Sequence, residues 1–83
     1  MFVERRRQPR KNGFKTGFLL RHDDPQTLDC LVWDLSDFGA LIEVEASADV
    51  PSNFRLIATA LFVDRECKTI WRDSRKIGVA FVF

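Results

Sequence analysis

Apolar and polar residues alternate along much of the chain. Between residues 14 and 21 every second residue shares one face, from Phe14 to Leu20. Residues 40–45 and 76–83 show the same spacing, with large apolar side chains on one side of each segment. A period of two residues is typical of β-strands, so the pattern predicts a strand in each of these segments.

Three further segments, residues 27–35, 54–62 and 65–72, are rich in apolar, β-branched and aromatic residues that favour strands. The run 54–62 has Arg55 as its only charge. Its period alone does not separate a buried strand from a helix, but the neighbouring segments favour a strand. Turn and loop residues lie between the predicted strands, at Asp23–Gln26, Ser36–Gly39, 46–53 and Asp73–Arg75.

Six strands joined by short turns, without an amphipathic helix, predict a small all-β domain. A barrel is favoured over a sandwich because closure removes the exposed edges of so small a sheet. We therefore expect a six-stranded antiparallel β-barrel over residues 14–83. Residues 1–13 have no periodicity and contain Pro9 and Gly13, so we expect a flexible basic arm that leads into the barrel.

The composition supports one domain and excludes several classes of protein. The chain has 83 residues, of which 46% are hydrophobic and 30% are charged. This is enough for one core and too apolar for a disordered protein. No uncharged stretch approaches the roughly 18 apolar residues of a membrane span, and no apolar segment follows the N-terminal arginines as a secretory signal requires. We expect a cytoplasmic protein with reduced thiols.

The net charge of +1 hides an uneven distribution. Residues 1–21 carry seven basic residues and one acidic residue, and residues 22–49 carry eight acidic residues and no Lys or Arg. Residues 50–83 carry six basic and three acidic residues. The positive charge of the N-terminal segment predicts a local contact with an anionic partner; a merely solvated tail is the alternative.

The sequence offers little for catalysis or metal binding. His22 is the only histidine, and Cys30 and Cys67 are the only cysteines, too few for a zinc site of four Cys or His ligands. Both cysteines fall inside predicted strands, where a free thiol packs as a small apolar group, although one disulfide between them is an alternative. We expect His22 to be solvated beside a turn. The expected protein is not an enzyme and has no cofactor or metal.

Four arginines lie within six residues, at Arg5, Arg6, Arg7 and Arg10. A guanidinium donates two parallel hydrogen bonds to a phosphate, or to O6 and N7 of guanine, and it stacks on a base. This segment therefore predicts contact with a compact ligand that carries phosphates and guanines. A nonspecific RNA-binding or localisation tail is the alternative.

A second group of candidate residues lies at a predicted junction of two strands, in Asp34-Leu35-Ser36-Asp37-Phe38-Gly39. A carboxylate at Asp34 can accept hydrogen bonds from N1 and N2 of guanine, and the Ser36 hydroxyl both donates and accepts. Gly39 would allow a positive φ and a close backbone approach. An ordinary turn with a glycine bulge is the alternative.

In order and spacing, the two groups resemble the signature of the PilZ domain, RxxxR followed by [D/N]xSxxG. The segments Cys67–Arg72 and Lys76–Phe81 are also similar to the end of that domain, and the resemblance covers nearly the whole chain, from about Arg5 to Phe81. The ligand-binding residues that it implies are Arg5, Arg6, Arg10, Asp34, Ser36 and Gly39.

The resemblance implies a bacterial receptor module for cyclic di-GMP, built as a six-stranded barrel. The arginine arm would wrap over the ligand, with Arg6 and Arg10 at the guanine and the phosphates. Asp34 and Ser36 would contact a guanine, and Gly39 would keep the shape of the turn. A PilZ-like adaptor that binds no nucleotide and a small RNA-binding barrel are the alternatives.

The resemblance also bears on partners. Many family members continue into a helix that covers one barrel opening, and here the last predicted strand reaches Phe83. An open end and eight phenylalanines predict exposed apolar surface and self-association as a homodimer. A module without an output domain would act on a downstream protein partner. Trp71 and Arg72 are further candidates for the site, although we expect Trp71 in the core.

Overall fold

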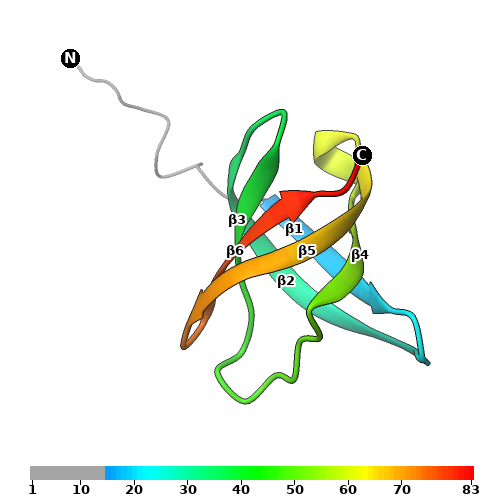
Figure 1. Ribbon diagram of the computed structural model, residues 1–83, viewed down its shortest axis with the longest axis vertical. Coiled ribbons are helices and arrows are strands. Elements are labelled where there is room, and N and C mark those ends of the chain that lie inside the picture. The colour runs from blue at the N-terminus through cyan, green and yellow to red at the C-terminus, as the bar shows by residue number, and fades with distance from the viewer. Residues whose placement is uncertain (1–14) are drawn as a thin grey trace.

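The computed structural model describes residues 15–83. They form six antiparallel strands and one 3-10 helix: β1 (Lys15–Arg21), β2 (Asp24–Leu35), β3 (Gly39–Glu43), β4 (Asn53–Ala58), η2 (Thr59–Leu61), β5 (Val63–Asp73) and β6 (Lys76–Phe81). The strands pair in the order β1-β2-β3-β6-β5-β4 and the sheet closes into a barrel (Figure 1). The predicted barrel is therefore confirmed. The predicted arm, with Arg5, Arg6 and Arg10, lies outside the described residues.

The core follows the alternation of the strands. In β6 the side chains of Ile77, Val79 and Phe81 are buried, as the pattern predicts. In β1 the buried residue is Leu19, so the alternating set that ends at Leu20 lies on the outer face. Burial of each such side chain contributes about 1.5–3 kcal/mol. The inner face of the barrel thus supplies the main stabilisation of the fold.

β4 ends earlier than the apolar run 54–62 predicts. The strand stops at Ala58, residues Thr59–Leu61 form η2, and Phe62 takes a left-handed conformation with φ 59° and ψ 36°. The prediction of a strand through residue 62 is wrong because an apolar run of this kind fits a strand or a helical turn equally well. The Phe62 side chain points into solvent and is 97% exposed.

The connection between β1 and β2 is also shorter than predicted. Arg21 pairs with Asp24, so the turn consists of His22 and Asp23 and does not extend to Gln26. A register shift follows Leu20 in β1. The irregular pairing accommodates Pro25 near the start of β2, because a proline has no backbone N–H to donate to the neighbouring strand.

The loop between β3 and β4 crosses one end of the barrel. Arg72 in β5 donates hydrogen bonds to the carbonyl oxygens of Ala48 at 2.7 Å and of Glu45 and Ala46 at 3.2 Å. From β1, Nη1 of Arg21 donates to the carbonyl of Asp49 at 3.1 Å. Two arginines therefore hold this loop over its end of the barrel. The β2–β3 turn, η2 and the C-terminus lie at the other end (Figure 1).

The barrel closes between β1 and β4. This pair is joined over three residues only, with Phe18 opposite Ile57, Leu19 opposite Leu56 and Leu20 opposite Arg55. Every other neighbouring pair of strands has a longer register. Within residues 15–83, no helix has the length and apolar character to cross a membrane.

Candidate functional site

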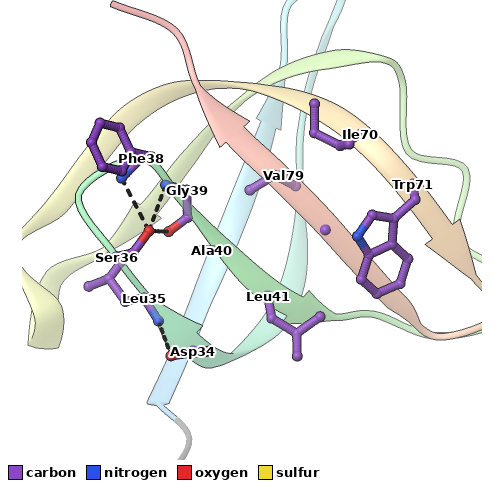
Figure 2. A pocket seen from close by; sticks show the side chains of 11 residues that line it. Asp34, Leu35, Ser36, Phe38, Gly39, Ala40, Leu41, Ile70, Trp71 and Val79 are labelled. Atoms are coloured by element: carbon purple, nitrogen blue, oxygen red, sulfur yellow. Dashed lines mark hydrogen bonds between the residues drawn. The ribbon is translucent and has the colours of Figure 1, made fainter.

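The turn between β2 and β3 is organised by one serine. The Ser36 hydroxyl accepts hydrogen bonds from the backbone N–H groups of Phe38 and Gly39, each at 3.2 Å, and donates to the Gly39 carbonyl at 3.4 Å (Figure 2). The Ser36 N–H donates to the same carbonyl at 2.9 Å. A hydroxyl has one donor and two acceptor sites, so these bonds occupy it fully. Ser36 shapes the turn, and its long 3.4 Å bond is the one most easily exchanged for another acceptor.

Gly39 is needed because another backbone passes beside it. A Cβ atom at this position would lie 2.1 Å from the Val79 carbonyl oxygen in β6. The expected close approach is therefore present, with β6 as the neighbour, whereas the expected positive φ is wrong. The Phe81 N–H also donates to the Phe38 carbonyl at 2.8 Å. Together these contacts hold the turn against β6.

A β-bulge in β2 turns Asp34 away from the core. Val32 pairs with Ile42, both of them buried, and the next paired residue is Asp34, opposite Leu41. Because side chains alternate along a strand, Asp34 would share the inward face of Val32 if no extra residue stood between them. The extra residue is Trp33, and it places the Asp34 carboxylate on the outer face.

Side-chain hydrogen bonds anchor the bulge. The Trp33 indole donates to Oε1 of Glu43 at 2.7 Å, and Nε of Arg75 donates to Oε2 at 3.0 Å. The hydrogen bond from Trp33, followed by that from Arg75, holds the pKa of the Glu43 carboxyl below its ordinary value. The Lys76 ammonium lies 5.1 Å from the centre of a Trp33 ring. The extra residue of β2 is thus fixed to β3 and the β5–β6 turn.

A second bulge does the same for Trp71 in β5. The register shifts between Thr69 and Trp71, around Ile70, and Trp71 pairs with Gly78 on the outer face. The Trp71 side chain is 48% exposed, so its expected place in the core is wrong. A Cβ atom on Gly78 would lie 2.1 Å from the indole Nε1. The missing side chain of Gly78 therefore lets the indole lie directly on the sheet.

The two bulges complete one row of residues across four strands. Asp34 in β2 pairs with Leu41 in β3, Leu41 pairs with Gly78 in β6, and Gly78 pairs with Trp71 in β5. With about 4.8 Å between neighbouring strands, the ends of the row lie about 14 Å apart along the sheet. A cleft of about 420 Å³ extends over the row. Figure 2 shows Asp34 and Ser36 on one side of Leu41 and Trp71 on the other.

The cleft is apolar with a single charge. Its lining includes Leu35, Phe38 and Ile70, and among the described residues that line it Asp34 alone is ionisable. The Asp34 Oδ1 accepts a hydrogen bond from the Leu35 N–H at 2.9 Å. No side chain among residues 15–83 pairs with this carboxylate, so it can accept hydrogen bonds from a ligand. An apolar floor with one carboxylate at its edge suits a planar ring that carries N–H donors on one side.

Arg72 does not belong to this cleft. Its guanidinium is occupied by the carbonyl groups of the β3–β4 loop and by the Ser74 carbonyl at 2.9 Å. Of the two further candidates from the sequence, the structure therefore places only Trp71 at the site. Leu41 and Gly78 were missed, because their place becomes apparent only when the strand register is known.

A larger cleft, of about 610 Å³, lies beside the β1–β2 turn. Most of its charges are paired: Arg21 pairs with Asp24 at 3.1 Å, and Arg55 pairs with Asp64 of β5 at 2.6 Å. His22 is exposed, as expected, and pairs with Glu66. Asp23 has no ion pair within residues 15–83, and the buried Nε of Arg21 has no hydrogen-bond partner there.

The described residues contain neither a metal cluster nor an activated thiol. In residues 15–83 no three His, Cys, Asp or Glu side chains are grouped to hold a metal ion. Cys30 and Cys67 are buried and free, so the alternative of a disulfide is wrong. Burial, followed by the charge of Asp29, raises the pKa of the Cys30 thiol to about 12, and burial raises that of Cys67 to about 11. Both thiols stay protonated at neutral pH and act as small apolar groups.

The candidate site is thus an outer-face cleft with Asp34 and the Ser36 turn at one side and Trp71 at the other. A comparison of the chain with protein-family models, with curated proteins and with solved structures finds no match.

Proposed function

We propose that this protein is a PilZ-like receptor for cyclic di-GMP, which it binds on the outer face of β3 and β6. The observation that carries the proposal is the row of residues from Asp34 to Trp71, which lies on one face under a cleft. The motif residues Asp34, Ser36 and Gly39 lie along one side of the same cleft.

The chemistry of guanine fits the two ends of the row. Its N1–H and N2–H₂ groups are neighbouring donors, and the Asp34 carboxylate can accept a hydrogen bond from each of them. Its flat face can stack on the exposed indole of Trp71, and stacking of this kind contributes about 1–3 kcal/mol per base. Leu41 and Gly78 offer a low floor between the two. The cleft volume of about 420 Å³ lies within the roughly 300–1,000 Å³ of small-molecule sites.

The connectivity of the chain supports a role for the arginines. β1 begins at Lys15, which pairs with Val32, two residues before Asp34. Arg10 is five residues before Lys15, and five extended residues span at most about 18 Å. Arg10 is therefore attached within reach of a ligand in the cleft. Arg6 lies four residues before Arg10 in the chain. At such a ligand, the guanidinium groups would neutralise phosphates that the apolar cleft leaves exposed.

Calorimetric titration of the whole chain tests this proposal. We expect binding at tens of micromolar cyclic di-GMP or below, and little binding of cyclic di-AMP, since adenine lacks the two adjacent donors that a carboxylate accepts. Asp34→Ala and Arg10→Ala should each weaken binding at least tenfold. Asp23→Ala, at the other end of the barrel, is the matched control and should bind normally.

A titration without heat or binding at these concentrations would refute the receptor function and leave the adaptor as the better proposal. Binding of generic single-stranded RNA, with an affinity that falls log-linearly as salt rises, would instead indicate an RNA-binding barrel. Amide shifts in residues 5–10 and 34–39 and at Trp71 and Gly78 would place the ligand in the proposed cleft, beneath the arginine arm.

A further inference from the structure

A second apolar surface lies at the end of the barrel opposite the arginine-held loop. We define the barrel mouth as Leu35, Asp37, Leu61, Phe62, Arg65 and Phe83, which line a hollow of about 400 Å³. Phe62 and Phe83 are 97% and 82% exposed. Monomeric proteins rarely leave large apolar side chains grouped in this way unless the surface binds something.

The backbone holds Phe62 in this exposed position. It takes the left-handed conformation, which a bulky side chain rarely adopts, and its N–H donates to the Thr59 carbonyl at 3.1 Å. The conformation ends η2 and directs the ring into solvent, where it gains no burial within the described part of the chain. Strain that serves no contact inside a domain points to a contact outside it.

The aromatic rings of the mouth are also ordered by a cation. The Arg65 guanidinium lies 4.4 Å from the ring centre of Phe83 and 4.8 Å from that of Phe81. Attraction between a guanidinium and an aromatic face restrains both partners. Phe83 is thus held in place beside the hollow before any partner arrives, which lowers the ordering cost of binding.

We propose that the barrel mouth is a homodimer interface, in which a second copy of this chain docks mouth to mouth about a two-fold axis. The charges of the mouth favour a second copy over another partner. Asp37 and Arg65 lie on the same rim with opposite charge, and within residues 15–83 neither has an ion-pair partner. A two-fold axis repeats each contact, so Arg65 of one copy faces Asp37 of the other, and Asp37 of the first faces Arg65 of the second.

The exposed area suits a dimer of modest affinity. A buried aromatic side chain removes about 150–250 Å² from water, so Phe62 and Phe83 together supply about 300 Å² or more per copy. With the rim, this approaches the lower end of specific interfaces, near 600 Å² per partner. We therefore expect a dissociation constant of about 10–100 μM. The interface does not rest on the proposed ligand, and its test contains no nucleotide.

Sedimentation equilibrium of the full chain, from about 5 μM to 1 mM, tests the interface. The mass should rise from 9.6 kDa toward twice that value. Phe62→Asn should weaken the dimer at least tenfold, and its fold should be retained because asparagine adopts the left-handed conformation readily. A monomeric mass at 1 mM, or an open-ended series of larger species, would overturn the proposal.

Charge reversal tests the geometry. Asp37→Arg and Arg65→Asp each place like charges at both contacts, and each variant alone should remain monomeric. An equimolar mixture of the two should dimerise again, because both contacts then join opposite charges. Asp23→Arg, with the same charge change at the far end of the barrel, should dimerise as the parent chain does. A mixture that stays monomeric, while circular dichroism shows both variants folded, would contradict the two-fold arrangement.

Discussion

Gly39 and Gly78 lie in neighbouring strands, and both leave too little room for a methyl group. At Gly39 the obstacle is the Val79 carbonyl, a backbone atom that cannot move without displacing β6. At Gly78 it is the Trp71 indole, a half-exposed side chain that can rotate away. The same substitution should therefore have different consequences at the two positions.

We expect Gly39→Ala to lower the free energy of unfolding by about 2–3 kcal/mol, because the added methyl group overpacks a backbone contact. Gly78→Ala should cost less than about 1 kcal/mol but displace the indole, so affinity for cyclic di-GMP should fall several-fold. Urea denaturation and calorimetric titration measure the two effects. Equal losses of stability would show that Trp71 is held as firmly as the backbone.

The buried thiols predict a loss of stability in alkali. The ordinary pKa of a cysteine is near 9.0, and burial raises those of Cys30 and Cys67 to about 12 and about 11. A raised pKa means that the stabilisation is complete below pH 9 and is lost as the pH rises through the folded-state values. The free energy of unfolding should thus decline between about pH 9 and pH 12, as followed by urea denaturation at each pH.

The double variant Cys30→Ala/Cys67→Ala is the control for that decline. It should be less stable at pH 7, because two buried sulfur atoms are replaced by space. The decline of its free energy of unfolding in alkali should be shallower than that of the parent chain. Parallel pH profiles would mean that the thiols are not protected by burial.

Among the elements, the strands were predictable and the bulges were not. Alternation identifies the inward residues of β3 and β6, since each side chain there meets either the core or the solvent. Trp33 and Ile70 interrupt that alternation, but a bulge depends on how two distant strands are registered, which the order of residues does not reveal. The sequence therefore located the turn residues of the site but assigned Trp71 to the wrong face.

The apolar run after β4 shows a second limit of the same kind. Phe54 and Leu56 point inward as in any strand, whereas Phe62 is exposed in a left-handed conformation. The types of side chain alone could not distinguish the strand from the exposed turn that follows it, because both halves of the run are apolar. The strand stops at Ala58, and the chain turns through η2 before β5 begins at Val63.

The β3–β4 loop should depend on Arg72. This side chain binds three loop carbonyls, and a charged hydrogen bond in a protein contributes about 1.5–3 kcal/mol, less where water competes. We expect Arg72→Ala to lower the free energy of unfolding by about 1–2 kcal/mol and to speed amide exchange in residues 45–50. Lys68→Ala, in the same strand, is the control. Unchanged exchange would mean that Arg21 and the packing of Val50 suffice.

At the scale of the whole molecule, the cleft and the barrel mouth share a wall. Leu35 and Ser36 line both hollows. A ligand that stiffens the β2–β3 turn would act on both surfaces, and coupling between two sites is reciprocal. Any change of dimer affinity by the nucleotide must therefore be matched by an equal change of nucleotide affinity on dimerisation.

Ligand binding should also stabilise the fold as a whole. At a cyclic di-GMP concentration 100 times the dissociation constant, the gain is about 2.7 kcal/mol. For a domain of this size, that corresponds to a rise in Tm of about 10–20 °C. Differential scanning fluorimetry should show the full rise for the parent chain and for Phe62→Asn, and no more than about half of it for Asp34→Ala, whose tenfold weaker binding leaves a gain of about 1.4 kcal/mol at most. A rise of equal size in Asp34→Ala would place the ligand elsewhere.

The short register between β1 and β4 has a consequence for how the protein folds and misfolds. Three paired residues close the ring, and they join segments more than thirty positions apart in the chain. Pairing of such distant segments is slow compared with the formation of a hairpin. In a chain that has paired its other strands but not yet β1 with β4, these two strands are the free edges of an open sheet, and such edges pair readily with other chains. Changes that weaken contact between Leu19 and Leu56 should therefore increase aggregation during refolding more than they lower the stability of the closed barrel.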